Sequence, residues 1–270
     1  MTERERPVLA NAMAPTRRRF LEAGSIAGAI GIGMLGASRG GTTRAAGLGA
    51  NKTCQESISE ILNTALTAER LATTLYFAAL TSHAVLRNPR VAGSSANPNA
   101  VGSDGNPENV AYLQAALDQE QKHAQLLAGA GAVSPYTRFH FPATTFTALG
   151  STREYGTFLW AVDHLETAFI SAYVAAVKQF STLGRPDLAL LASRLLAVEC
   201  THRALYRVIA GDDPADNVTL EVAEFACVAD AATALTSFLT GRGFSTRERV
   251  TIALPTPAQT ARVVGQNTSR

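Results

Sequence analysis

The sequence predicts an all-α protein: a bundle of four long helices with a long crossover connection between the second and third, and an accessory fifth helix. Three observations support this fold class. From residue 54 to about 240, apolar residues recur at the i, i+3, i+4 and i+7 spacing of one helical face. Pro and Gly residues divide this region into segments of helical length, and we find no run with the alternation typical of a sheet. The 270 residues, 46% of them hydrophobic, suffice for one core of ordinary domain size.

The first predicted hairpin pairs a helix over 56–86 with a second helix over 108–129. The first helix should end before Pro89, because proline disfavours helical backbone in the residue that precedes it. The connection, 88–109, is rich in Gly, Ser, Asn and Pro and is too polar to pack. Pro107 then suits the opening of the second helix.

The second predicted hairpin follows an irregular segment, 134–150, which contains several aromatic residues and is long enough to cross the length of a bundle. Its first helix is expected to start at STRE (151–154), a capping-box pattern, and to run to Leu183. Its second helix opens with Pro186 in the first turn and ends at Gly211.

A fifth apolar helix is predicted over Val218–Leu239, which completes a helical bundle domain over 54–240. The C-terminal tail, 241–270, is short and mixed in character, and we assign it no function.

The N-terminal residues 1–45 are predicted to be a signal peptide rather than part of the fold. A basic stretch precedes a Gly- and Ala-rich apolar run, 25–38, which is shorter than the about 20 apolar residues that span a bilayer. Paired arginines followed by Phe and Leu resemble the twin-arginine export signal: Arg17, Arg18, Phe20 and Leu21. We therefore expect the twin-arginine export machinery as a partner and an exported location, periplasmic or otherwise extracytoplasmic. The alternative is a basic tail that merely contains paired arginines.

Charge and cysteine content exclude several classes of protein. Charged residues make up 17% of the chain and the net charge is +2, so there is no basic face of the kind that nucleic acid requires, and we expect no nucleic-acid partner. The three cysteines, Cys54, Cys200 and Cys227, are too few for a disulfide scaffold or a Cys-rich zinc site. One disulfide can form, and the sequence does not decide which cysteines pair.

Each of the four long helices carries one glutamate inside its apolar stripe, and two of these are followed three residues later by histidine on the same face. Glutamate is rarely buried without a partner, and an uncompensated buried carboxylate costs several kcal/mol or takes up a proton. No Lys or Arg occupies these stripes. Two divalent cations would balance four carboxylates, and neutral imidazoles would complete the coordination. The candidate metal ligands are Glu69, Glu120, His123, Glu166, Glu199 and His202.

The two hairpins look like repeats of one unit, which strengthens this interpretation. At about 1.5 Å per residue, each antiparallel hairpin brings its glutamate and its Glu-x-x-His pair to similar heights. Tyr76 stands seven residues after Glu69, and Tyr173 stands seven after Glu166. One Glu-x-x-His pair alone would be a weak signal, more often a surface pair than a ligand set. One Glu from each of two helices plus Glu-x-x-His from each of two others is the ligand pattern of dinuclear carboxylate bundles.

On these residues, Glu69, EQKH (120–123), Glu166 and ECTH (199–202), the chain resembles ferritin-like di-iron carboxylate proteins. It is most similar to exported ferritin-like proteins related to plant desiccation-related proteins, over about residues 54–240. The resemblance implies that Glu120 and Glu199 bridge two metal ions. It also implies that Glu69 with His123, and Glu166 with His202, are terminal ligands. The long connection over 88–109 departs from the usual short turn, which leaves open the form of any homo-oligomer.

Other residues near these ligands are weaker candidates. Tyr76 and Tyr173 lie about two turns beyond their glutamates, where either hydroxyl could support a ligand or carry an oxidising equivalent; the alternative is core packing with a satisfied hydroxyl. Asp163 could orient a ligand, whereas His164 should point off the metal face. Cys200 should face away from the stripe and be packed rather than reactive.

The resemblance implies a redox enzyme with two Fe ions as cofactor and O2 or H2O2 as its small-molecule substrate. Mixed carboxylate and imidazole ligands suit iron or manganese, and six side chains on two ions leave positions open for an oxidant. We expect Fe(II) oxidation or the reduction of O2 or peroxide. The alternatives are a dimanganese catalase-like enzyme with the same ligands and two Mn ions, or a metal-stapled stress or desiccation protein without turnover.

Overall fold

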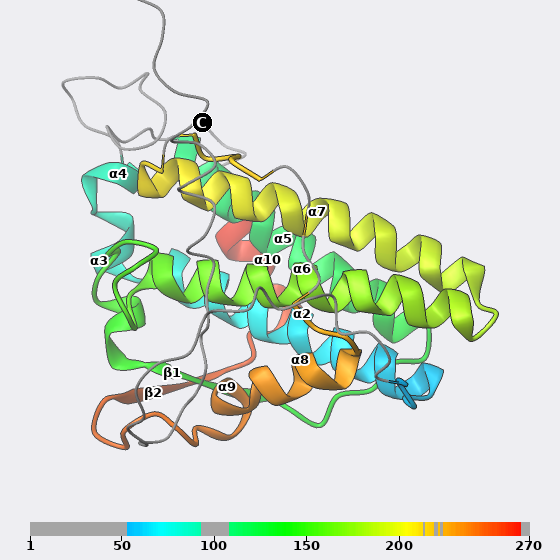
Figure 1. Cartoon of the computed structure of the whole chain (residues 1–270). Helices are drawn as coiled ribbons and strands as arrows, with labels where there is room; N and C mark the ends of the chain where they lie inside the picture. Colours follow the sequence, from blue (N-terminus) through cyan, green and yellow to red (C-terminus); the bar gives the residue numbers. More distant parts are fainter. Residues whose placement is uncertain (1–52, 93–107, 213, 219–220, 222–223, 266–270) are drawn as a thin grey trace, which may run out of the picture. The chain divides into compact units, whose positions relative to one another are not determined.

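The computed structural model describes residues 53–92, 108–212, 214–218, 221 and 224–265. Two helical hairpins form a bundle: α2 packs mainly against α5, and α6 mainly against α7 (Figure 1). The predicted all-helical bundle is therefore confirmed, with a small two-stranded sheet added to it. The predicted signal peptide and most of the connection between the first two helices lie outside the described residues. The four long helices are α2 (Ile58–Leu80), α5 (Glu108–Gly129), α6 (Phe158–Thr182) and α7 (Pro186–Ala210).

Helix α2 ends six residues earlier than predicted. It begins after a capping box, in which Ser57 and Glu60 satisfy each other's backbone N–H groups, and ends at Leu80. Ser82 has extended backbone, and its hydroxyl donates to the carbonyl of Phe146 at 2.6 Å, so the chain changes direction there. Two short helices follow: α3 (His83–Leu86) and α4 (Pro89–Ala92).

Helix α6 begins later than the capping-box pattern at 151–154 predicts. The backbone N–H groups of Phe158 and Leu159 donate to the carbonyls of Ala148 and Leu149, at 3.1 and 3.0 Å. These contacts satisfy the first helical donors from outside the helix, so the local capping sequence is not used. The prediction that the helix starts at residue 151 was wrong for this reason.

The predicted fifth helix is replaced by two shorter ones, α8 (Val228–Ala234) and α9 (Thr236–Thr240). Its expected first turns are not helical where the structure describes them, because Cys227 has extended backbone and forms a disulfide. Helix α8 packs against α6 and α2. A final helix, α10 (Pro257–Gly265), packs against α5.

A two-stranded antiparallel sheet was not predicted. Strand β1 (Arg138–Pro142) lies in the long connection between α5 and α6, and it pairs with β2 (Arg249–Ala253) in the C-terminal tail. Phe139 and Phe141 point into the core and are fully buried, which gives β1 a buried face of alternate residues. The segment is only five residues long, too short for its alternation to stand out in the sequence.

The apolar core consists of two clusters, one on each side of a polar layer. One cluster includes Leu71 of α2 and Leu117 of α5 and extends to the sheet; the other includes Leu66 of α2 and Leu195 of α7. Between the two clusters, each long helix contributes one glutamate. The core therefore isolates these carboxylates from water on both sides. Among the described residues, no helix has the length and apolar character needed to cross a membrane.

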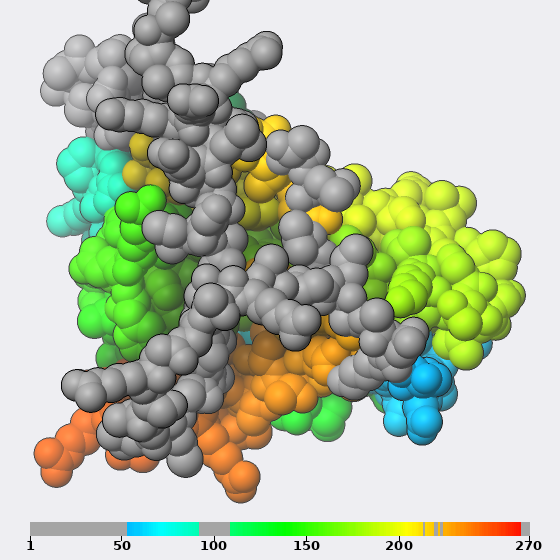
Figure 2. Space-filling model, viewed as in Figure 1, coloured from blue at the N-terminus to red at the C-terminus, as the bar shows by residue number. Residues whose placement is uncertain are grey.

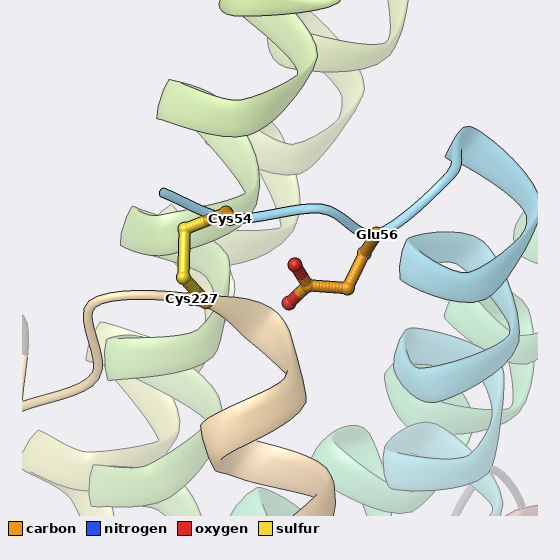
Figure 3. A group of neighbouring side chains, drawn as sticks. All are labelled: Cys54, Glu56 and Cys227. Atoms are coloured by element: carbon orange, nitrogen blue, oxygen red, sulfur yellow. A yellow bond between two sulfur atoms is a disulfide. The ribbon is translucent and has the colours of Figure 1, made fainter. Parts of the chain in front are cut away.

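The disulfide that the sequence left open joins Cys54 to Cys227 (Figure 3). It links the segment before α2 to the start of α8. Two side chains add to this link: Glu56 accepts a hydrogen bond from the N–H of Ala229 at 2.7 Å, and Gln179 of α6 accepts one from Val228 at 2.8 Å. We call the disulfide, Glu56 and Gln179 the α8 clamp.

We expect the double substitution Cys54→Ser, Cys227→Ser to lower the free energy of unfolding by roughly 2–5 kcal/mol. The bond closes a loop between residues 173 positions apart, so its loss increases the conformational entropy of the unfolded chain. Urea denaturation followed by circular dichroism measures the change. The matched control is Cys200→Ser, at the unpaired cysteine, which should unfold at the urea concentration of the unchanged protein. A double variant with an unchanged midpoint would show that the bond contributes nothing.

Candidate metal centre

All six side chains that the sequence singles out as candidate ligands meet in the polar layer between the two apolar clusters. Glu69 comes from α2 and Glu166 from α6, while α5 and α7 each supply a Glu-x-x-His pair. None is more than 6% exposed, which is rare for ionisable residues: Glu69, Glu120, His123, Glu166, Glu199 and His202.

The helix geometry explains this convergence. A residue and the one three positions later lie on the same side of a helix, so each Glu-x-x-His pair presents both groups to the bundle axis. The antiparallel packing of α2 on α5, and of α6 on α7, then brings the side chains of each hairpin to similar heights along the bundle axis. His123 Nδ1 of α5 lies 3.2 Å from Glu69 Oε2 of α2, so the two helices are in the predicted register.

The first group of potential ligands surrounds His123. Its Nδ1 atom lies 3.3 Å from Glu199 Oε1 and 3.8 Å from Glu120 Oε2, in addition to the contact with Glu69. One ligand atom from each of these four residues lies within 4.8 Å of the others. The group spans α2, α5 and α7.

The second group surrounds His202. Its Nδ1 atom lies 2.9 Å from Glu120 Oε1, 3.3 Å from Glu199 Oε2 and 3.9 Å from Glu166 Oε1. These four residues also offer ligand atoms that lie within 4.8 Å of one another. Glu120 and Glu199 thus belong to both groups, each directing one oxygen toward each histidine.

The carboxylates strongly perturb one another. Burial, together with repulsion from Glu199 and Glu69, raises the pKa of the Glu120 carboxyl well above its ordinary value. Burial and repulsion from Glu199 likewise raise the pKa of Glu166. For Glu199 burial acts in the same direction, but hydrogen bonds from His123 and His202 outweigh it and lower the pKa to about 2.

The pKa values of both imidazoles are also raised, although burial opposes the change. Burial alone would lower the pKa of His123, but hydrogen bonds with Glu120, Glu199 and Glu69 raise it to about 12. For His202, the effect of burial is likewise outweighed by the neighbouring carboxylates, first Glu199, and the pKa rises to about 9. In the chain alone, protons on the two histidines balance part of the carboxylate charge.

Protons on the imidazoles do not satisfy all the carboxylate oxygens. Beyond these contacts with the histidines, both oxygens of Glu120, one of Glu166 and one of Glu199 are buried and have no hydrogen-bond partner among the described residues. Buried acceptors of this kind are costly unless a hydrogen-bond donor or a cation compensates them. The donor set is four carboxylates and two imidazoles without thiolates, which suits hard or borderline cations. The residues therefore fit two cations that share Glu120 and Glu199; that they bind metal stays a prediction.

Each of the two predicted tyrosines donates a hydrogen bond to the glutamate of the opposite hairpin. The hydroxyl of Tyr76, on α2, donates to Glu166 Oε1 at 2.6 Å, and the hydroxyl of Tyr173, on α6, donates to Glu69 Oε1. Burial and the nearby carboxylates raise the pKa of both phenols, so they remain protonated donors. The sequence relates each tyrosine to the glutamate seven residues before it, whereas the contact is made across the bundle.

One contact to a histidine was not anticipated. His202 Nε2 lies 2.8 Å from the side-chain oxygen of Gln119, which suits an Nε2–H donor and leaves Nδ1 directed at the carboxylates. Gln119 precedes Glu120 and is exposed, so its position in the helical pattern gave no signal of this role.

The remaining candidates lie outside the cluster. Asp163 accepts a hydrogen bond from the hydroxyl of Tyr206. The ring of His164 stacks on that of Trp160, with the centroids 5.3 Å apart, and so faces away from the cluster as expected. Cys200 is half-buried, and burial is the main cause that raises the pKa of its thiol to about 11, which disfavours a reactive thiolate.

A third acidic group, at Cys54, Glu56 and Cys227, is not a metal site in this structure. Its three side chains lie close enough to share an ion, but both sulfur atoms are consumed by the disulfide (Figure 3). The Glu56 carboxylate is directed at the start of α8, where it accepts the Ala229 N–H.

Comparison with known families gives one result. The model of the ferritin-like domain matches residues 57–212, which is more than half of the chain and includes all six candidate ligands. No curated protein and no solved structure matches the chain significantly.

In the metal-free protein, we expect the melting temperature to fall as the pH rises from about 6.5 to about 9. The pKa of His202 is raised from 6.5 to about 9 and that of His123 to about 12, so the folded state holds these protons more tightly than the unfolded chain. The stabilisation from His202 is fully present below pH 6.5 and is lost as the pH rises through about 9, while that from His123 declines over the same interval and is lost only as the pH rises through about 12. The raised pKa values of Glu120 and Glu166 act in the same direction.

Thermal unfolding of chelator-treated protein across this interval measures the effect. Metal-loaded protein is the comparison, and its stability should hold or increase, because metal ions and protons compete for the same atoms. A metal-free protein whose melting temperature stays constant or rises would contradict the described charge balance.

Proposed function

Because the chain belongs to the ferritin-like domain family, we propose that its buried cluster is a di-iron carboxylate centre that oxidises Fe(II) with dioxygen or hydrogen peroxide. The observation that carries the proposal is that the two groups of ligand atoms share Glu120 and Glu199. Two ions would be close enough to share these carboxylates, as the paired ions of two-metal sites, about 3.5–4 Å apart, are.

The remaining residues divide evenly between the two positions. Glu69 and His123 would hold one ion, and Glu166 and His202 the other, the division that the family resemblance implies. The contact between His202 Nε2 and Gln119 supports coordination through Nδ1. The lack of a thiolate in the set favours iron or manganese over softer metals.

When bound, the metal pair supplies two electrons, one from each Fe(II), which convert O2 and two protons to H2O2, or H2O2 and two protons to two waters. The chain's own part is to hold charge and to exclude water. The four carboxylates offset the charge of the cations, and the apolar clusters on either side keep bulk water from the layer.

We assign Tyr76 and Tyr173 the role of positioning residues. Each phenol donates to one oxygen of a terminal glutamate, so the other oxygen is left for the metal. Because each donor sits on the opposite hairpin, the position of each terminal carboxylate depends on the packing of the two hairpins against one another.

We retain the proposal that the protein is exported. The Cys54–Cys227 disulfide supports it, since structural disulfides persist in oxidising compartments and are rare in the cytosol. A twin-arginine route, which carries folded proteins, would allow the centre to be loaded before export.

We expect the purified protein, expressed with iron, to hold two iron ions per chain, and Glu120→Gln, Glu199→Gln to lose both. The amide neither carries charge nor bridges two cations, while its shape preserves the packing. Elemental analysis gives the stoichiometry, and circular dichroism checks the fold. The matched control is Glu154→Gln, at an exposed glutamate before α6, which should keep both ions. Native protein without metal, after expression in medium supplied with iron and manganese, would remove the basis of the proposal.

Rates with defined metals should separate the three candidate functions. For the proposed activity, anaerobic Fe(II)-loaded protein should be oxidised when dioxygen or peroxide is added, which a stopped-flow absorbance measurement follows. Vigorous O2 release from peroxide by manganese-loaded protein would instead favour the catalase-like alternative. A reduced, fully loaded protein that reacts with neither oxidant would identify a structural metal site.

A further inference from the structure

A small cavity lies between α2, α6 and α8, beside the candidate metal centre. About 20 Å³ of it is open to the centre of a water-sized molecule, which is room for one or two small molecules. Eleven residues line it, and nine of them carry no polar side-chain atom. Its mainly apolar lining favours small apolar molecules such as xenon over water.

Tyr173 connects the cavity to the polar layer that holds the candidate ligands. Tyr173 lines the cavity, and its hydroxyl donates to Glu69, a terminal ligand of the proposed centre. That hydroxyl is already committed to a carboxylate, so it offers little to a polar guest. A molecule in the cavity therefore contacts a tyrosine whose hydroxyl is hydrogen-bonded to Glu69.

Helix α8 forms the cover of this cavity. Val228, Ala231 and Leu235, in or next to α8, contribute to the lining, and the outer side of the helix lies at the surface (Figure 2). A seven-residue helix has little stability of its own. The α8 clamp holds its first turn in place through the disulfide and the two N–H contacts to Glu56 and Gln179, so the cover is fixed rather than free to collapse inward.

We propose that this cavity is a binding site for dioxygen, from which the oxidant reaches the Glu69 and His123 side of the centre. The inference rests on the function proposed above and selects dioxygen over peroxide as the oxidant. Dioxygen is uncharged and makes no strong hydrogen bonds, so it loses little on entering an apolar cavity. Hydrogen peroxide would leave its donors and acceptors without partners there, which disfavours its entry.

A second cavity makes a suitable comparison. It is about half as large, at about 10 Å³, and lies on the His202 side. Three tyrosine rings contribute to its lining: Tyr76, Tyr112 and Tyr206. The hydroxyls of Tyr76 and Tyr206 donate to Glu166 and Asp163, but the lining also includes Tyr112 and the imidazole of His202. The second cavity is therefore the more polar of the two and the weaker candidate for dioxygen.

Xenon is the probe, detected by crystallography of the purified protein under xenon pressure. We expect xenon between α2, α6 and α8, and its loss in Ala176→Val, which adds two carbons to the lining one turn after Tyr173. The matched control is Ala116→Val, which fills the second cavity at an alanine of the same 3% exposure and should leave xenon in place. Should Ala176→Val not fold, Leu235→Ala enlarges the same cavity and should raise xenon occupancy.

In Ala176→Val, the rate at which limiting dioxygen oxidises bound Fe(II) should fall roughly fivefold or more, because less oxidant is held beside the centre. Iron per chain, and the rate with hydrogen peroxide, should not change. Absence of xenon from the cavity of the unchanged protein, or an unaltered dioxygen rate in Ala176→Val, would overturn the proposal. Xenon binding needs no metal, so protein that holds two irons but no xenon defeats this inference alone, whereas protein without iron defeats the proposed function.

Discussion

Repulsion among four buried carboxylates is the constraint on which the rest of the structure depends. Glu120 and Glu199 are completely buried, and Glu69 and Glu166 are nearly so, between two apolar clusters that offer no solvation. Such an arrangement is strongly unfavourable unless positive charge lies among the oxygens. In the chain alone, protons on two histidines supply part of that charge, yet several oxygens have no hydrogen-bond partner beyond these histidines. These side chains could hold the cations that proteins bind through carboxylate and imidazole.

The sequence predicted the helices well where their limits are local, and poorly where they are not. Pro186 and Gly211 begin and end α7 as expected, because proline in the first turn and a left-handed glycine at the end act through their own backbone. By contrast, α6 starts at Phe158, where carbonyls from the preceding loop satisfy its first N–H groups. The β1–β2 pair joins segments about a hundred residues apart, and no local pattern reports such a pairing.

In the candidate site, too, features set by position on a single helix could be predicted, and features set by the packing of helices could not. The six acidic and imidazole side chains could be found from helical periodicity, because position on a helix fixes the face on which a side chain lies. The periodicity did not reveal that Tyr76 and Tyr173 donate across the bundle, or that Gln119 contacts His202, since these contacts depend on how the helices pack. The pairing of Cys54 with Cys227 was also open, because it depends on where α8 lies against α2.

The exchange of tyrosine donors between hairpins has a consequence for anyone who redesigns this protein. The carboxylate of Glu69 is oriented by a phenol from α6, and that of Glu166 by a phenol from α2. Neither hairpin, grafted alone onto another scaffold, would carry a complete half of the site. A transplant must therefore include both hairpins in their mutual register. To change the position of one terminal glutamate, a designer would have to alter the tyrosine on the other hairpin as well.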